Sequence, residues 1–160
     1  MASASYQTRR DEIETYFDRT AADAWAALTS DAPVSRIRRT VRHGRDAMRQ
    51  TLMSWLPEDM TGSTLIDAGC GTGTLAIEAA QRGAEVVAVD LSPTLVNLAR
   101  ERLRDLNQTL DVTFLVGDMR DMDLGSFDYA VAMDSLIHYD VADGVCLLYT
   151  SDAADDLRCV

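Results

Sequence analysis

The sequence contains no lysine, so all 15 of its basic residues are arginine. They are outnumbered by 26 acidic residues, and the net charge of −11 disfavours nonspecific binding to nucleic acid, which needs a basic surface. No stretch approaches the roughly 20 apolar residues of a membrane-spanning helix, and residues 1–10 lack the apolar core of a signal peptide. We therefore expect a cytoplasmic protein without a nucleic-acid partner, for which only peripheral membrane contact stays open.

Cysteine is scarce as well. The three cysteines, Cys70, Cys146 and Cys159, make neither a metal-ligand spacing nor a disulfide framework, so we expect no bound metal. Their low number suits a reducing compartment. With 160 residues, 47% of them apolar, the chain is at most one domain with one hydrophobic core.

Residues 1–60 predict a helical cap made of two helices. The first runs from Tyr6 to Leu28. The second starts after a break, with a capping oxygen at Ser30 or Asp31 and Pro33 in its first turn, and it ends at about Trp55.

The second helix carries two stripes at helical spacing. One is apolar: Val34, Ile37, Val41, Met48, Leu52 and Trp55. The other, along its border, is basic: Arg38, Arg42, Arg45 and Arg49. The arginine stems can cover the edge of the core while their heads stay in water, or the stripe can form a cationic rim that receives an anionic substrate. The sequence leaves both interpretations open.

From residue 61 onwards strands alternate with helices. The apolar runs Thr64–Ala68, Glu85–Val89, Val112–Val116 and Phe127–Met133 predict four strands, separated mainly by helix-length segments. Such alternation predicts right-handed crossovers and a parallel sheet of the α/β class over residues 61–145.

The first strand enters a glycine-rich loop. Gly69, Gly71 and Gly73 alternate with small residues, and glycine allows the positive φ and the close ligand approach that such a loop needs. A dehydrogenase G-x-G-x-x-G pattern that starts at Gly69 would need a glycine at position 74, where Thr74 stands. The spacing therefore disfavours a nicotinamide-dependent dehydrogenase.

Acidic residues follow the strands at the same edge of the predicted sheet: Asp67, Asp90, Asp118 and Asp134. Ligands of open α/β sheets bind beyond the carboxyl ends of the strands. Asp90 is placed to hold ribose hydroxyls, and Asp118 to accept a hydrogen bond from an exocyclic amine. Each aspartate taken alone is typical of an ordinary loop, but four aspartates beside a glycine loop indicate a site for a nucleotide-like ligand.

The spacing of Asp67, Gly69, Gly71 and Gly73 resembles the [D/E]-x-G-x-G-x-G motif of Rossmann-like, class I S-adenosylmethionine-dependent methyltransferases. The resemblance extends from Leu65 to Ile137. It implies S-adenosylmethionine as cofactor, with Asp90 at the ribose and with Asp118 and Met119 at the adenine. It also places Asp134 in the cofactor site.

A narrower resemblance links the chain to the magnesium-protoporphyrin IX O-methyltransferases of bacteriochlorophyll synthesis. The segments that carry it are Tyr16–Thr20, Trp25, Val34–Arg38, Gly44–Asp46 and Ala132–Tyr139. It implies methyl transfer to a propionate of magnesium protoporphyrin IX, with His138 as the catalytic residue that orients the propionate and the arginine stripe as part of a lid. It also suggests magnesium chelatase subunits as partners and peripheral contact with the inner or photosynthetic membrane.

Two other functions stay open at this point. One is methylation of a different small molecule, such as a quinone precursor, and the other is binding of S-adenosylmethionine without catalysis. Residues 146–160 resemble a translated sequencing adaptor, so we expect a non-native tail and a sheet truncated after its fourth strand. A truncated sheet with an exposed strand edge would be poorly stable and inactive.

Overall fold

The structure, a computed structural model, describes residues 4–20, 22–29, 33 and 35–138. Within them lies a parallel sheet built from β1 (Thr64–Ala68), β2 (Glu85–Asp90), β3 (Val112–Val116) and β4 (Tyr129–Val131). The strand order is β3-β2-β1-β4, and every neighbouring pair is parallel. The predicted α/β sheet is thus confirmed, although β4 is shorter than the predicted run. The predicted tail, residues 146–160, lies outside the described residues.

One face of the sheet carries the main hydrophobic core. It is covered by α4 (Thr74–Gln81), α5 (Pro93–Asp105) and the C-terminal end of α3 (Arg36–Trp55). Buried side chains from all three helices meet Leu65, Val86 and Ala88 of the strands there. A smaller cluster on the other face gathers around Val89 and Met119. The strands therefore alternate their side chains between the two clusters, as a sheet covered on both faces requires.

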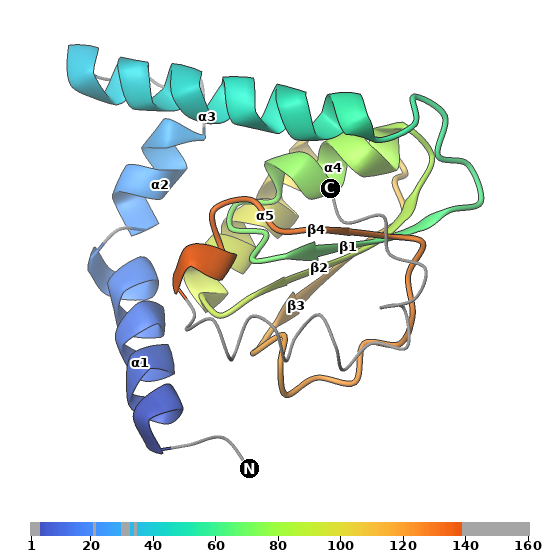
Figure 1. The fold of residues 1–160 in the computed structure, drawn as a ribbon. Helices are drawn as coiled ribbons and strands as arrows, with labels where there is room; N and C mark the ends of the chain where they lie inside the picture. Colours follow the sequence, from blue (N-terminus) through green and yellow to red (C-terminus); the bar gives the residue numbers. More distant parts are fainter. Residues whose placement is uncertain (1–3, 21, 30–32, 34, 139–160) are drawn as a thin grey trace.

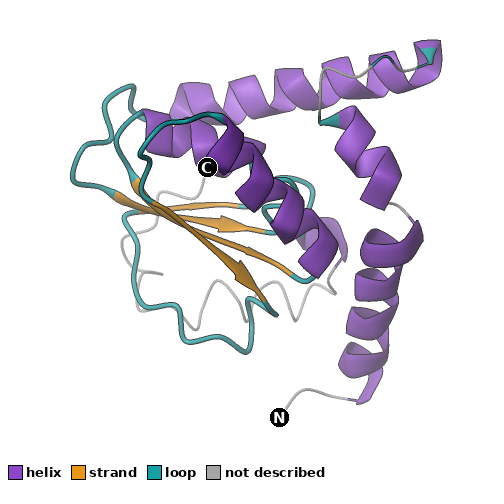
Figure 2. Ribbon diagram, turned by 180° about the vertical axis from the view of Figure 1, so that it is seen from behind, coloured by secondary structure: helices purple, strands orange, loops and turns teal. Residues whose placement is uncertain are grey.

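The N-terminal cap contains more elements than the two predicted helices. The first predicted helix is divided into α1 (Ala4–Thr15), a π-helical turn (Tyr16–Thr20) and α2 (Ala22–Leu28). Figures 1 and 2 show α1 and α2 beside the carboxyl ends of the strands, where the arrowheads point. π-helical turns are rare and are often found at functional sites, and here one lies between α1 and α2.

The second predicted helix corresponds to α3, but its start differs from the prediction. Its N-cap is Ser35, whose hydroxyl accepts the backbone N–H of Arg38, so Pro33 precedes the helix instead of lying in its first turn. Ser30 and Asp31, the predicted capping residues, lie outside the described residues. The predicted end at Trp55 is confirmed.

The two stripes of α3 lie differently from what its pattern indicates. Ile37 of the apolar stripe is 80% exposed, and Val41, Met48 and Trp55 are exposed as well. Arg42, Arg45 and Arg49 are half-buried instead. These three arginines of the basic stripe face the rest of the molecule, where carboxylates and a backbone carbonyl accept their hydrogen bonds, whereas Arg38 is exposed. No helix in the described part of the chain is long and apolar enough to cross a membrane.

Candidate functional site

A pocket opens at the carboxyl ends of the strands, between the sheet and the N-terminal cap. The glycine loop and the ends of β2 and β4 form one side, and cap residues that include Phe17, Trp25 and Arg45 form the other. Of the residues predicted for the cofactor, this lining includes Asp67, Gly69, Gly71, Asp90, Met119 and Asp134. The structure therefore brings together residues from four loops that the sequence separates.

The glycine loop has the geometry that its composition predicts. Gly69, Gly71 and Gly73 all have positive φ, at 84°, 53° and 74°. A Cβ on Gly69 would lie 2.2 Å from the Cβ of Ser135, whereas a Cβ on Gly71 would meet nothing within 4 Å. Gly69 is thus needed for close packing, and Gly71 leaves room for a ligand against the backbone.

Asp90 shapes this loop from the end of β2. Its Oδ2 accepts the backbone N–H of Gly71 at 2.8 Å, and its Oδ1 accepts the N–H of Ser92 at 2.9 Å. Burial raises the pKa of the Asp90 carboxyl, and hydrogen bonds from backbone N–H groups oppose that rise. Asp90 therefore positions the loop and also faces the pocket.

Asp67 is the most unusual polar residue of the site. It is 2% exposed, and its Oδ2 has no hydrogen-bond partner among the described residues. Burial, followed by repulsion from Asp90, raises the pKa of Asp67 to about 7, while a backbone N–H of Ala76 opposes the rise. Burying a hydrogen-bond acceptor without a donor costs free energy. The Oδ2 atom of Asp67 is therefore available to a hydrogen-bond donor or a cation that binds in the pocket.

Asp118 and Met119 lie just beyond β3. Met119 lines the pocket, whereas Asp118 is not among the lining residues and is 4% exposed. The Asp118 carboxylate accepts the N–H of Arg120 at 3.0 Å, and its other oxygen lies 3.7 Å from the Nε of Arg10 on α1. The predicted adenine contact of Asp118 stays a prediction, and the structure adds that this carboxylate binds the cap.

Arg45 connects the cap to the end of β4. Its guanidinium pairs with Asp134 and stacks over the Trp25 ring at 4.0 Å from the ring centroid. Burial lowers the pKa of Arg45, and the charge of Asp134 opposes that effect. Asp134 itself has a positive φ of 60°, which marks the sharp turn that brings its carboxylate to the pocket.

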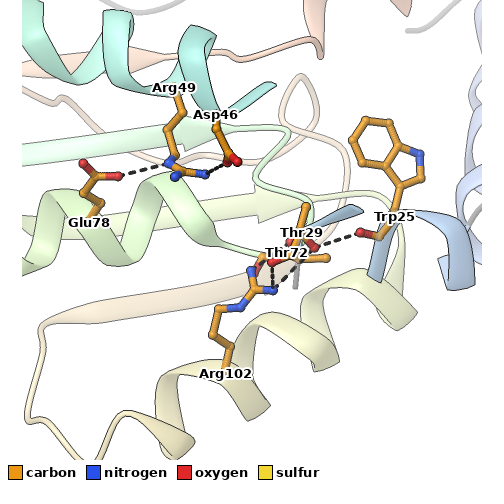
Figure 3. Close-up of polar contacts among 7 residues, drawn as sticks. All are labelled: Trp25, Thr29, Asp46, Arg49, Thr72, Glu78 and Arg102. Atoms are coloured by element: carbon orange, nitrogen blue, oxygen red, sulfur yellow. Dashed lines mark hydrogen bonds and ion pairs between the residues drawn. The ribbon is translucent and has the colours of Figure 1, made fainter. Parts of the chain in front are cut away.

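The other predicted substrate residues lie elsewhere. Arg38 is exposed, Arg42 donates to the carbonyl of Ala27, and Arg49 pairs with Asp46 and Glu78 (Figure 3). None of the three lines the pocket described here. His138 is the last residue of a 3-10 turn, Leu136–His138, and its side chain lies outside the described part of the structure.

Two further observations concern reactive groups. Cys70 lines the pocket, but burial and the nearby charges of Asp67 and Asp90 raise the pKa of its thiol well above the ordinary value, which disfavours the thiolate that a nucleophile needs. Among the residues that the structure describes, no group of three or more His, Cys, Asp or Glu side chains could hold a metal ion.

Some residues of the site could not be found from the sequence interpretation. Asp18 caps α5, and Arg102 joins Thr29 to the glycine loop. Nothing in the periodicity of the chain singles them out. Their partners are 30 to 76 residues away, so only the folded chain shows their roles.

The parallel sheet, the glycine loop with its preceding aspartate and the pocket at the strand ends define the Rossmann-like fold of class I methyltransferases. A family model described as a methyltransferase domain matches residues 65–149. The chain therefore belongs to the methyltransferase-domain family.

Individual relatives narrow the comparison. The magnesium-protoporphyrin O-methyltransferase of Rhodobacter capsulatus is 54% identical over 141 residues, which cover 88% of this chain and 62% of that protein. A crystal structure of magnesium protoporphyrin IX methyltransferase from Synechocystis PCC 6803 with bound SAM superposes with a TM-score of 0.81 at 28% identity, covering 88% of this chain and 68% of that one. A ubiquinone biosynthesis O-methyltransferase of Xanthomonas oryzae pv. oryzae is 39% identical, but over only 50% of this chain and 34% of its own length. The chain thus spans less than two thirds of the Rhodobacter relative.

Proposed function

We propose that this protein transfers a methyl group from S-adenosylmethionine to a propionate carboxylate of magnesium protoporphyrin IX, giving the monomethyl ester. The observation that carries the proposal is the pocket with two chemically different walls. The glycine loop, Asp67 and Asp90 form an acidic wall, and Arg45 with Trp25 forms a cationic and aromatic wall. The 54% identity to the Rhodobacter enzyme supports the choice of substrate.

The acidic wall fits the proposed cofactor. S-adenosylmethionine carries an ammonium group and a sulfonium, and Asp67 offers a buried oxygen that lacks a partner among the described residues. A cation near Asp67 and Asp90 would favour their ionised forms, which burial now disfavours. Asp90 is the proposed ribose contact, and Asp118 and Met119 are proposed for the adenine. Gly71 leaves the backbone accessible to such a ligand.

The main task of the protein in this reaction is to position the reacting groups. When bound, the cofactor supplies an electrophilic methyl group, so that the ester C–O bond forms as the C–S bond breaks. A propionate is already ionised at neutral pH, and no strong base is needed. Arg45 can orient the carboxylate through paired N–H donors, and we propose that His138 holds it from the end of β4. Alignment of the reacting groups accounts for most of the rate.

The test combines binding with turnover. Titration calorimetry with S-adenosylhomocysteine measures cofactor binding, and mass spectrometry after incubation with S-adenosylmethionine and magnesium protoporphyrin IX detects the monomethyl ester. A demethylated quinone precursor and the same porphyrin without cofactor serve as controls. Methylation of the quinone precursor alone would overturn the proposed substrate. Binding without any methyl transfer would fit either a non-catalytic module or the inactivity expected of a truncated sheet.

The contacts outside the pocket are also part of the proposal. A cytoplasmic protein with peripheral contact to the inner or photosynthetic membrane, and with magnesium chelatase subunits as partners, would need an exposed docking face. The exposed apolar side chains of α3, Ile37, Val41, Met48 and Trp55, are consistent with such a face. Vesicle flotation and pull-down with chelatase subunits, each compared with a Trp55→Gln variant, test the two contacts separately.

A further inference from the structure

Arg102 joins two segments that both contribute to the lining of the pocket. Its Nη1 donates to the carbonyl and hydroxyl of Thr72 at 2.8 and 3.0 Å, and its Nη2 donates to the carbonyl of Thr29 at 2.6 Å (Figure 3). Thr72 belongs to the glycine loop, and Thr29 directly follows α2 of the cap. One half-buried guanidinium from α5 therefore serves both the loop and the cap.

The acceptors of Arg102 are groups that need a donor. Thr72 is 4% exposed and lies between Gly71 and Gly73, which both have positive φ. Its carbonyl therefore lies in an irregular loop and not in a helix or strand. The carbonyl of Thr29 follows the last residue of α2, where helix carbonyls lack partners within the helix and favour a cation. Arg102 satisfies both with its two terminal nitrogens, which fix the distance between the loop and the cap.

The connection continues from Thr29 around the pocket. The backbone N–H and the hydroxyl of Thr29 both donate to the carbonyl of Trp25, at 3.0 and 2.8 Å. The Trp25 ring lies under Arg45, which pairs with Asp134 at the end of β4. Contacts thus run from the glycine loop, through the cap, to Asp134 after β4.

From this arrangement we propose that Arg102 is a positioning residue that couples closure of the N-terminal cap to the shape of the glycine loop. The inference rests on the proposed function for its ligand, S-adenosylmethionine. When the cap lies closed, Arg102 holds the carbonyl of Thr72 in place and the loop is ready for the cofactor. By thermodynamic reciprocity, a cofactor that orders the loop also holds the cap closed.

A second contact between the cap and the sheet domain lacks this link. Arg49 of α3 pairs with Glu78 of α4 at 3.1 Å, a contact that does not involve the glycine loop (Figure 3). Arg100, on the same helix as Arg102, donates to the carbonyl of Phe114 at 2.6 Å; its charge acts on Cys70 of the loop, but in the contacts that the structure gives it Arg100 donates no hydrogen bond to the loop or the cap. Glu78→Gln and Arg100→Gln are therefore matched controls for loss of a cap contact and for loss of an α5 arginine.

The experiment reads cap position and cofactor affinity independently. The sequence has two tryptophans, so a Trp55→Phe background leaves Trp25 as the single reporter of the cap. Acrylamide quenching of Trp25 measures cap opening, and calorimetry measures the Kd of S-adenosylhomocysteine. In this background Arg102→Gln is expected to raise quenching and to weaken the affinity by about tenfold, within the usual range of allosteric coupling. Neither control should change the Kd.

The outcomes separate the inference from the proposed function. Quenching and Kd equal to those of Arg100→Gln overturn the inference, and so does raised quenching with unchanged affinity. If the parent protein binds no S-adenosylhomocysteine, the proposed cofactor is wrong, and the quenching comparison still shows whether Arg102 holds the cap. Circular dichroism verifies folding. If Arg102→Gln does not fold, Arg102→Lys is the deciding variant. Its single ammonium group cannot replace the two terminal nitrogens of arginine, so the quenching of Trp25 and the Kd should lie between those of the parent and those expected for Arg102→Gln. Quenching and Kd equal to those of the parent overturn the inference.

Discussion

The carboxylate of Asp18 accepts a hydrogen bond of 3.1 Å from the backbone N–H of Thr94, a residue 76 positions further along the chain. The same oxygen accepts the Ser92 hydroxyl at 3.1 Å, and the hydroxyl oxygen of Ser92 accepts the N–H of Leu95 at 3.2 Å. Helix α5 therefore begins with two capping side chains, one of its own and one supplied by the N-terminal cap. The cap is part of the architecture of the sheet domain at this point.

Replacement of Asp18 by Ala should destabilise the protein. Loss of a capping side chain costs about 1 kcal/mol, and here it also loosens the cap from α5. Urea denaturation followed by circular dichroism measures the free energy of unfolding. The control is Asp23→Ala, at an exposed position in α2. Equal stability of the two variants would show that the Asp18 contact contributes nothing.

Two glycines of the loop should respond differently to alanine. Gly69→Ala brings a Cβ within 2.2 Å of Ser135 and should reduce thermal stability strongly. Gly71→Ala meets no atom within 4 Å, so only the left-handed backbone opposes it, at about 1–2 kcal/mol. Its main effect should be weaker binding of S-adenosylhomocysteine, because the methyl group occupies ligand space. A folded Gly71→Ala variant with unchanged affinity would contradict a ligand at this backbone.

The raised pKa of Asp67 predicts how stability depends on pH. The pKa is about 7 in the folded protein and 3.8 in the reference state, so between these values the folded state binds more protons. The free energy of unfolding should therefore fall as pH rises from 4 to 7, by at most about 1.4 kcal/mol per pH unit from this group.

Asp67→Asn should remove that slope, because the amide does not titrate. The variant should gain stability relative to the parent at pH 8 and less or none at pH 5. Denaturation curves across this range, with the exposed Asp105→Asn as control, provide the measurement. A parent and an Asn variant with parallel pH profiles would show that Asp67 ionises normally.

Replacement of Arg45 should affect the side of the pocket that is proposed to bind the substrate. Under the proposed function, Arg45→Ala should raise the KM for magnesium protoporphyrin IX by about tenfold or more, since a charge-assisted hydrogen bond to the carboxylate is lost. The cofactor affinity should change less than the KM. Steady-state kinetics and calorimetry separate the two.

Arg39→Ala, an exposed position on the same helix, is the control for this prediction. Asp134→Asn weakens the ion pair that now holds Arg45, so it should change the porphyrin KM as well. Parent-like KM values in both Arg45→Ala and Asp134→Asn would exclude this pair from substrate binding.

Much of the cofactor side of the site could be predicted because its signals are local. A glycine that needs positive φ and an aspartate at the end of a strand are visible in short stretches of sequence, and the parallel sheet then places them together. The structure places Asp67, Asp90, Gly69 and Gly71 at the pocket and gives all three glycines positive φ, while their roles toward a cofactor stay predictions. The roles of Asp118 and His138 toward ligands stay predictions.

The cap could be predicted only in outline. Helical spacing indicated α3 and its end at Trp55, but the same spacing favoured burial of an apolar stripe whose member Ile37 is 80% exposed. Periodicity reports which side chains share a face of a helix, and it does not report what lies opposite that face. Glu78 and Asp134 lie opposite the arginines, so the basic face turns inward.

The sequence by itself determined the class of fold, the glycine loop and the acidic ends of the strands, because each depends on residues close together in the chain. Only the tertiary structure decided that Asp18 caps α5, that Arg45 meets Asp134 and that Arg102 bonds to Thr29 and Thr72. These contacts join residues 30 to 89 positions apart, and their strength depends on burial and geometry that no local pattern contains.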